Sequence, residues 1–142
     1  MRRTLKTGIH PDQFDIWILL FRVLIAAFML THGLPKFYKL MAGGEISFGN
    51  PLGFGPVATL VLTVFAEVVC STFILIGLGT RLATIPLMIT MAVAAFIVHG
   101  DDPFGRKELP LLYLFSFVTL CILGSGKYSV DFLLSRRLNI RK

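Results

Sequence analysis

Charged residues are scarce in this sequence. Asp, Glu, Lys and Arg make up 15% of the 142 residues and 55% are hydrophobic, whereas a soluble globular domain has about 25% charged residues. This scarcity excludes a soluble domain of any size and indicates a membrane protein. The formal net charge of +6 does not indicate nucleic-acid binding, because the basic residues cluster towards the two ends and form no stripe with aromatic residues. Anionic lipid head groups are their expected partner.

Cysteines are few, and nucleotide-binding motifs are absent. The two cysteines, Cys70 and Cys121, lie in apolar runs and form no C-x-x-C pair. This excludes a disulfide framework and a dithiol redox pair within the chain, and we interpret both cysteines as packing residues. The Gly-Leu-Gly at residues 77–79 follows an apolar run and lacks the rest of a dinucleotide-binding fingerprint.

The chain consists mainly of four long apolar segments. They cover about residues 16–34, 57–78, 82–98 and 109–126, and about 20 apolar residues suffice to cross a bilayer as a helix. Pro35 is expected to end the first segment. Residues 127–142 mix Leu and Phe with Arg and Lys, and we expect them to form an amphipathic cytoplasmic tail on the membrane surface. The predicted fold class is an all-α membrane protein, a four-transmembrane-helix bundle.

The order of the segments also predicts a topology. Nine Lys and Arg residues fall on the side of the two termini and four on the other side, so both termini are predicted to be cytoplasmic. Ala-Ala-Phe followed by His-Gly occurs at residues 26–33 and again at 94–100, and similar glycine-containing turns end the second and fourth segments. These similarities indicate two repeated helix pairs, or else helices that simply end at glycine caps.

Two charges lie inside the apolar segments. Glu67 is in the second segment and Arg22 is in the first. At a rise of 1.5 Å per residue, Arg22 would lie about 9 Å and Glu67 about 15 Å from the cytoplasmic side, a gap that one arginine side chain can bridge. We therefore predict a buried polar core in which Arg22 pairs with Glu67, with Arg81 as a third member. Such a core either fixes the register of the helices or holds a ligand head group or relays a proton.

A second polar cluster is predicted at the outer ends of the segments. Its members are His32, Lys36, His99 and Glu108, and we expect them to hold a quinone oxygen or an anionic substrate. The two histidines have other interpretations. They could be haem or metal ligands, or residues that a helix carboxyl terminus favours, and we assign no metal site to them.

Taken in order, these residues resemble the DoxX family of small bacterial membrane proteins. The resemblance extends over about residues 16–132. It rests on Arg22, His32-Gly33 with Lys36, Glu67, Gly77-Leu78-Gly79-Thr80-Arg81, His99-Gly100, Glu108, and Gly124-Ser125-Gly126-Lys127-Tyr128-Ser129-Val130-Asp131. It implies that residues 1–142 are a single, multi-pass DoxX-like domain of the bacterial cytoplasmic (inner) membrane. Some members form the membrane part of a thiosulfate:quinone oxidoreductase, and others are associated with thiol or oxidative-stress systems.

The function that this resemblance implies is a quinone- or lipid-binding subunit associated with a membrane oxidoreductase. Such a subunit would carry no intrinsic cofactor, would bind a quinone, and would contact a partner oxidoreductase subunit. Its apolar helix faces favour a homo-oligomer. Two other functions stay open: a non-enzymatic membrane scaffold, in which the charges only fix the bundle, and a small proton-coupled carrier, which would need to dimerise. The sequence also leaves open whether the chain is itself an enzyme.

Overall fold

The computed structural model describes residues 10–138. All regular secondary structure in this range is helical, and the range contains no strand. The prediction of an all-α fold is therefore confirmed for this part of the chain. The elements are α1 (Pro11–Ala42), α2 (Pro56–Val64), η1 (Phe65–Cys70), α3 (Ser71–Ile76), α4 (Thr80–Val93), η2 (Ala94–Val98), α5 (Phe104–Leu123) and α6 (Val130–Arg137). Two of them, η1 and η2, are short stretches of π-helix that continue directly from the α-helices before them.

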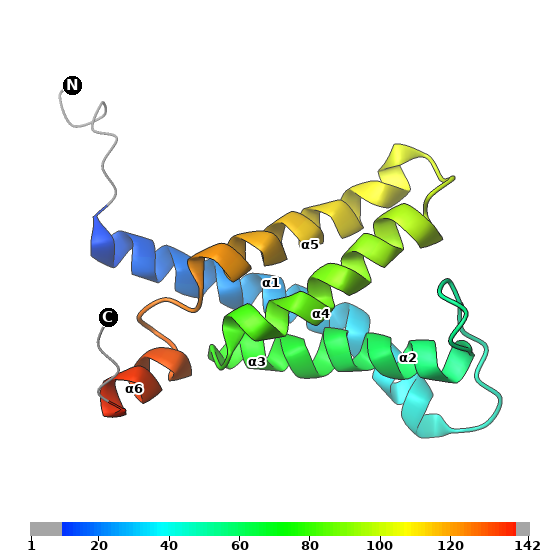
Figure 1. Cartoon of the computed structure of the whole chain (residues 1–142), viewed down its shortest axis with the longest axis horizontal. Coiled ribbons are helices and arrows are strands. Elements are labelled where there is room, and N and C mark those ends of the chain that lie inside the picture. The colour runs from blue at the N-terminus through cyan, green and yellow to red at the C-terminus, as the bar shows by residue number, and fades with distance from the viewer. Residues whose placement is uncertain (1–9, 139–142) are drawn as a thin grey trace.

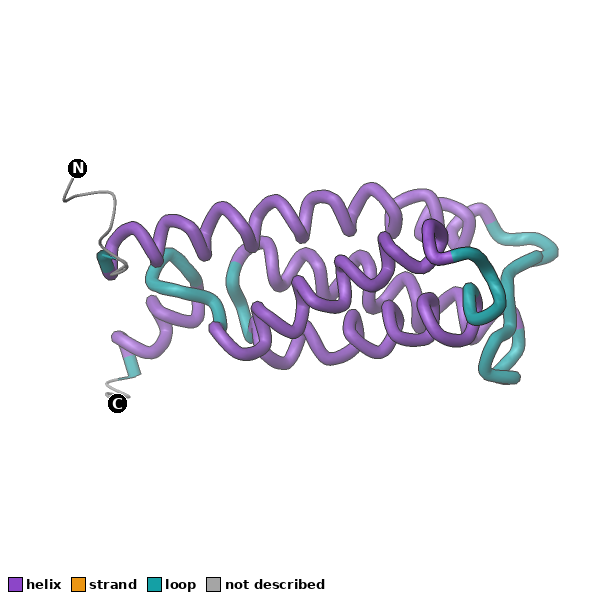
Figure 2. The backbone as a smooth tube through the Cα atoms, turned by 90° about the horizontal axis from the view of Figure 1, so that it is seen from above, coloured by secondary structure: helices purple, strands orange, loops and turns teal. Residues whose placement is uncertain are grey.

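Four helical rods run side by side along the long axis of the molecule (Figures 1 and 2). They are α1, the continuous stretch from α2 to α3, the stretch from α4 to η2, and α5. The connections at residues 43–55 and 99–103 lie together at one end, which we call the loop end. The start of α1, the turn at residues 77–79, and the segment from residue 124 to α6 lie at the opposite end, the terminal end (Figure 1).

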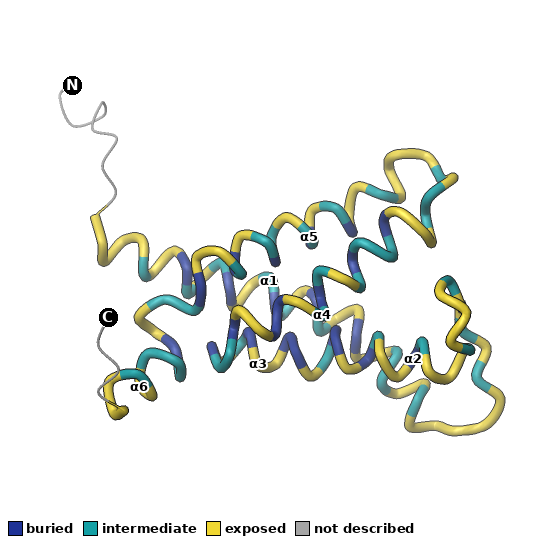
Figure 3. Tube along the Cα trace, viewed as in Figure 1, coloured by how far each residue is buried: buried dark blue, intermediate teal, exposed yellow. Residues whose placement is uncertain are grey.

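The rods pack in a defined order. α1 packs along the α2–α3 rod, that rod packs against α4, and α4 makes its most extensive contacts with α5. Buried residues follow the faces where rods meet, and the outward faces are exposed (Figure 3). The core residues include Met29, Ile74, Leu87 and Phe117. Each rod thus contributes one apolar face to a common core.

The outward faces carry large apolar side chains. Trp17 is 63% exposed, and Phe28, Phe65 and Phe96 are likewise exposed on other faces of the bundle. A contiguous apolar surface of this kind suits a lipid environment and not water. Three helical stretches are long and apolar enough to cross a membrane: Pro11–Ala42, Pro56–Ile76 and Thr80–Val98. At 1.5 Å per residue, a stretch of about 20 residues matches a hydrocarbon core of about 30 Å.

The observed helix bounds differ most from the predicted ones in α1. This helix is 32 residues long and contains Pro35, so the prediction that Pro35 ends the helix is wrong. A proline inside a membrane helix removes one backbone hydrogen bond, but local adjustments and neighbouring helices can satisfy the freed carbonyl group. Pro86 and Pro110 lie inside α4 and α5 in the same way. Because α1 continues past Pro35, Lys36 is part of this helix.

Candidate functional site

A cavity of about 150 Å³ lies at the loop end of the bundle, between all four rods. We call it the loop-end pocket. Its polar lining comes from His32 and Lys36 of α1, Glu67 of η1, His99 after η2, and Tyr113 of α5, and its apolar lining from Met29, Met91, Ala94, Leu109 and Pro110. Three of the four residues that we predicted for an outer cluster therefore line one cavity.

The central feature of this pocket is an ion pair between Lys36 and Glu67. The Lys36 Nζ donates to both carboxylate oxygens of Glu67 at 2.6 Å. The Glu67 side chain is 3% exposed and the Lys36 side chain is 31% exposed, so the carboxylate is buried and the ammonium group borders the cavity. A buried carboxylate in a membrane span is costly unless it is paired. Lys36 supplies that pairing and still has one N–H free for another acceptor.

Local backbone geometry explains why Lys36 reaches Glu67. A Cβ atom built on Gly33 would lie 2.9 Å from the Glu67 Cβ and 2.8 Å from the Val68 Cγ2. The backbone of α1 therefore lies directly against η1 at this level, which only a glycine permits. Lys36 follows Gly33 by about one helical turn, and its long side chain extends back to the carboxylate. Glu67 itself lies within the π-helical stretch η1, an irregularity that is frequent at functional sites.

His32 of α1 and Tyr113 of α5 form an aromatic pair at the wall of the pocket. The His32 and Tyr113 rings meet edge to face, with their centroids 5.7 Å apart and their planes at 87°. Tyr113 also stacks on Phe117, with the centroids 6.1 Å apart. Sequence reasoning did not single out Tyr113. The signal that could have found it is a buried tyrosine in an apolar helix, because its hydroxyl group usually needs a polar neighbour.

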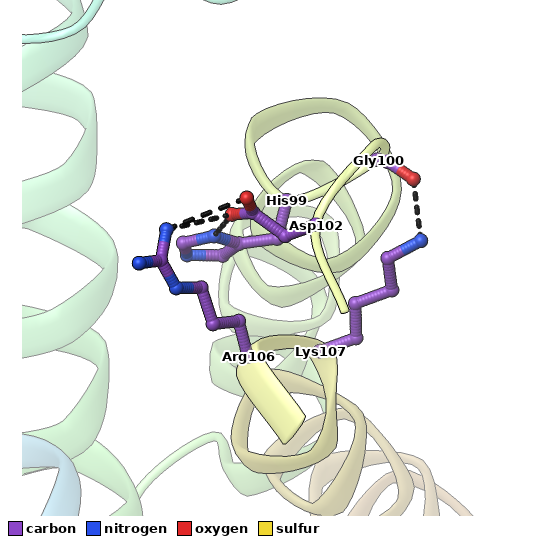
Figure 4. Close-up of polar contacts among 5 residues, drawn as sticks. All are labelled: His99, Gly100, Asp102, Arg106 and Lys107. Atoms are coloured by element: carbon purple, nitrogen blue, oxygen red, sulfur yellow. Dashed lines mark hydrogen bonds and ion pairs between the residues drawn. The ribbon is translucent and has the colours of Figure 1, made fainter. Parts of the chain in front are cut away.

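His99 lies at the mouth of the pocket and is held by the loop that follows it. Its Nδ1 atom lies 2.7 Å from the Asp102 Oδ2, and Asp102 also contacts Arg106 at 3.4 Å (Figure 4). The Lys107 Nζ donates to the Gly100 carbonyl group in the same loop (Figure 4). The hydrogen bond with His99, assisted by the nearby Arg106, lowers the pKa of Asp102 below its ordinary value.

The predicted pair between Arg22 and Glu67 is wrong. The buried Arg22 guanidinium donates instead to the Ser125 carbonyl group at 2.9 Å and to the Tyr128 carbonyl group at 2.8 Å. Its Nη1 atom lies beside Gly77, at the end of α3, whereas Glu67 lies ten residues earlier, about 15 Å away along the helix. Our estimate assumed that the start of the first span and the end of the second span lie at the same depth. In the structure, α1 begins well before the level at which α3 ends, because Arg22 lies beside Gly77.

Two further predicted site residues lie elsewhere than expected. Arg81 is exposed and donates to the Ile122 carbonyl group at 3.2 Å, so its assignment to the buried polar core is wrong. This residue begins α4 at the surface of the terminal end. Glu108 is exposed on α5, and it is absent from the residues that line the pocket. In the second turn of α5, Leu109 and Pro110 line the pocket instead.

A second polar cluster, at the terminal end, holds α6 against the bundle. The Asp131 carboxylate accepts from the backbone N–H groups of Gly79 at 2.7 Å and Thr80 at 3.3 Å. The Asp131 N–H donates to the Gly77 carbonyl group at 3.0 Å. Together with the hydrogen bonds of Arg22, these contacts form what we call the terminal latch. A carboxylate at the start of α4 is also favoured by the helix dipole.

The two polar clusters differ in what they can do chemically. Among residues 10–138, no three His, Cys, Asp or Glu side chains gather as a metal ion would require. The terminal latch joins charged side chains to backbone groups. The loop-end pocket offers an ammonium group, a carboxylate, two imidazoles and a phenol around open space. This set can bind a small polar ring through hydrogen bonds.

Comparisons with known proteins agree with the apolar architecture. The sequence model of the DoxX family matches residues 17–100, which is more than half of the chain. An uncharacterized protein of Haemophilus influenzae is 31% identical over 78% of this chain and 84% of its own length. An uncharacterized membrane protein of Mycobacterium tuberculosis is 30% identical over 84% of this chain and 82% of its own length. No solved structure matches the chain. The chain is a membrane protein that belongs to the DoxX family.

Proposed function

We propose that the loop-end pocket binds the polar ring of a membrane quinone, and that the chain is a quinone-binding subunit associated with a membrane oxidoreductase. The observation that carries this proposal is the ion pair of Lys36 and Glu67, which borders open space inside the bundle. A paired charge that only fixed helix register would need no cavity beside it. A cavity with a free N–H donor at its wall suits a carbonyl oxygen.

The size of the pocket limits what enters it. A protein cavity of about 150 Å³ can accept a benzene molecule, so the volume here suits one six-membered ring and not a whole lipid. A long hydrocarbon tail attached to that ring would lie outside the cavity, against the apolar outer face of the bundle. His32 and Tyr113 present aromatic surface to such a ring, and aromatic pairs contribute about 0.5–1.5 kcal/mol beyond the burial of area.

The proposal places the chain in the bacterial cytoplasmic membrane with four spans and cytoplasmic termini. Its support is the position of α1 and α6, which approach the same end of the bundle, and the excess of Lys and Arg in the sequence on that side. The fourth span would be α5. Its first turns carry Arg106, Lys107 and Glu108, which then lie at the outer interface, while its apolar remainder packs on α4.

A partner subunit would supply the electrons. The sequence contains no dithiol pair and no c-type haem motif, so the chain's own residues would bind and orient the quinone ring while another subunit reduces or oxidises it. In this scheme Lys36 donates a hydrogen bond to a ring carbonyl oxygen. Both carboxylate oxygens of Glu67 accept from the Lys36 Nζ and hold it in place.

Binding of short-chain ubiquinone and menaquinone analogues to the protein in lipid nanodiscs tests the proposal. Lys36→Met should weaken binding about tenfold or more, because it removes a charge-assisted hydrogen bond worth about 1.5–3 kcal/mol. Lys39→Met is the matched control, since Lys39 lies one turn further along α1 and is exposed. Circular dichroism and size-exclusion chromatography show whether each variant remains folded.

Two results would contradict the proposal. The first is a wild-type protein that binds neither analogue, and the second is equal binding by the folded Lys36→Met and Lys39→Met variants. Either result would favour the scaffold function. In that case the pair of Lys36 and Glu67 would serve only the packing of α1 on η1.

A further inference from the structure

We propose that His99 and Asp102 make the loop-end pocket select a ring hydroxyl over a ring carbonyl, and that protonation of His99 removes this preference. The inference rests on the proposed function, because it concerns which form of the ring the same pocket binds. In chemical terms, the pocket prefers the reduced quinol when His99 is neutral. It binds the quinol and the quinone about equally when His99 is charged.

The hydrogen bond between His99 and Asp102 fixes which ring nitrogen carries the proton. An ionised carboxylate can only accept a hydrogen bond, so the Asp102 Oδ2, 2.7 Å away, requires a proton on the His99 Nδ1. The lowered pKa of Asp102 keeps this carboxylate ionised. The Nε2 atom of a neutral His99 therefore has a free lone pair and acts as an acceptor. Asp102 is the positioning residue for this imidazole.

The loop around His99 is built to hold this arrangement. The Asp102 N–H donates to the His99 carbonyl group at 3.2 Å, and the His99 N–H donates to the Ala94 carbonyl group at 3.0 Å. Arg106 contacts both Asp102 oxygens at 3.4–3.5 Å, and Lys107 ties Gly100 to the start of α5. Figure 4 shows His99, Gly100, Asp102, Arg106 and Lys107 together. Both sides of the carboxylate are thus engaged, and its orientation towards His99 is set.

Among the polar groups that line the pocket, His99 is the one whose acceptor nitrogen is fixed by a hydrogen bond. Both oxygens of Glu67 already accept from Lys36. Lys36 is a donor, and the Tyr113 hydroxyl can serve as either donor or acceptor. His32 packs edge to face on Tyr113. A ligand hydroxyl that enters the pocket accordingly finds Lys36 for its oxygen and the neutral His99 for its proton.

The expected preference is about tenfold for the quinol, because a carbonyl ligand leaves one partly buried acceptor without a partner. The His99 side chain is 34% exposed, which keeps the effect near the lower end of the range for such losses. On protonation the Nε2 atom becomes a donor, which a hydroxyl oxygen and a carbonyl oxygen can both accept, and the preference should then fall to about one. Histidine ordinarily changes its charge between about pH 5 and pH 8.

Anaerobic binding of short-chain ubiquinol and ubiquinone to the protein in nanodiscs tests this inference. The measured quantity is the ratio of the two dissociation constants between about pH 5 and pH 8. Asp102→Asn is the main variant. Arg106 would retain the side-chain oxygen, so the amide N–H₂ group would donate to Nδ1 and move the ring proton to Nε2. We expect the quinol preference to disappear at neutral pH. Asp101→Asn is the matched control, because it removes the same charge from the adjacent, exposed residue.

A second measurement needs no ligand. Nitrogen-15 NMR of the imidazole rings should show the Nδ1–H tautomer for His99 in the wild type and the Nε2–H tautomer in Asp102→Asn, with His99→Gln used to assign the signal.

Different results overturn the two proposals. Binding of both ring forms with a ratio that does not change with pH, or equal ratios in Asp102→Asn and Asp101→Asn, would overturn the inference while leaving the proposed function intact. An Nε2–H tautomer of His99 in the wild type would also overturn it. Absence of binding of either form to the wild type would overturn the proposed function and, with it, the selection of a ring form.

Discussion

The two polar clusters of this bundle satisfy a buried charge in different ways. At the terminal end, Arg22 donates to the backbone carbonyl groups of Ser125 and Tyr128. At the loop end, Glu67 accepts from the side chain of Lys36, next to a cavity. Backbone carbonyls cannot leave without unfolding the segment that carries them, whereas a lysine side chain can turn to another acceptor.

This difference separates a structural charge from one that is suited to binding. A guanidinium group held by two backbone carbonyls fixes the position of the chain at residues 125–128 against α1. An ammonium group that borders a cavity and is 31% exposed can share its donors between a carboxylate and a ligand. We therefore expect variants at the terminal end to lower mainly the stability, and variants at the loop end to change mainly the binding.

The largest loss of stability is expected for Arg22→Met. It removes two charge-assisted hydrogen bonds and leaves two carbonyl groups without that donor, which should lower the free energy of unfolding by about 3 kcal/mol. Urea unfolding in detergent measures the loss. Arg81→Met is the control, since Arg81 is exposed and makes one longer hydrogen bond, and it should cost less than about 1 kcal/mol. Equal losses would remove the distinction between the two arginines.

The next effect separates backbone strain from a steric clash at the terminal end. Gly77 and Gly79 both have left-handed backbone conformations, with φ of +73° and +56°, so alanine should cost about 1–2 kcal/mol at either position. A Cβ on Gly77 would also lie 1.9 Å from the Arg22 Nη1, whereas nothing lies within 4 Å of one on Gly79. Gly77→Ala should thus be less stable than Gly79→Ala by about 1–2 kcal/mol.

Thermal unfolding of the two alanine variants, side by side, is the measurement. If they unfold at the same temperature, the guanidinium group has enough freedom to move aside, and the terminal latch is looser than its hydrogen bonds indicate. The combination with Arg22→Met sharpens the comparison. It should relieve part of the extra cost of Gly77→Ala, because the guanidinium group is then absent while the Ser129 Cβ would still lie 2.6 Å from the new Cβ.

The smallest stability effect is expected at the loop end. Glu67→Gln leaves Lys36 without its charged partner, but Lys36 is partly exposed, so the loss should be about 1–2 kcal/mol. Adding Lys36→Met should recover part of that loss, because no unpaired charge then remains. A double-mutant cycle by thermal unfolding measures this coupling. A coupling near zero would show that the pair contributes nothing to the folded state and that its role lies in binding alone.

The sequence was sufficient to predict the helices, because an apolar run in lipid has to satisfy its backbone groups internally and therefore forms a helix. It was less informative about where they end. The apolar composition shows which residues suit the hydrocarbon core, but α1 continues in both directions beyond that core, from Pro11 and past Pro35 to Ala42. The polar residues at its ends gave no sign of this continuation.

The same limit applied to the candidate site. Arg22 and Glu67 were recognisable as costly charges within apolar runs, and His32, Lys36 and His99 do line a common pocket. Their partners depend on the stagger between antiparallel helices, which composition does not contain. The close approach at Gly33 sets that stagger. Asp102 was not identified because its contact with His99 depends on the conformation of the turn between them. Tyr113 was not identified because its place in the pocket depends on which face of α5 turns inward.

The terminal latch has a consequence for biosynthesis. Arg22 and its carbonyl partners are separated by 103 and 106 residues, so the ribosome must add more than 100 residues after the arginine before it can be paired. The first helix must therefore enter the membrane with an uncompensated cation, at a cost of up to about 3 kcal/mol when such a residue lies near the centre of a span. Synthesis of residues 125–131 is the step that supplies the partners of this charge and of the backbone N–H groups at the start of α4.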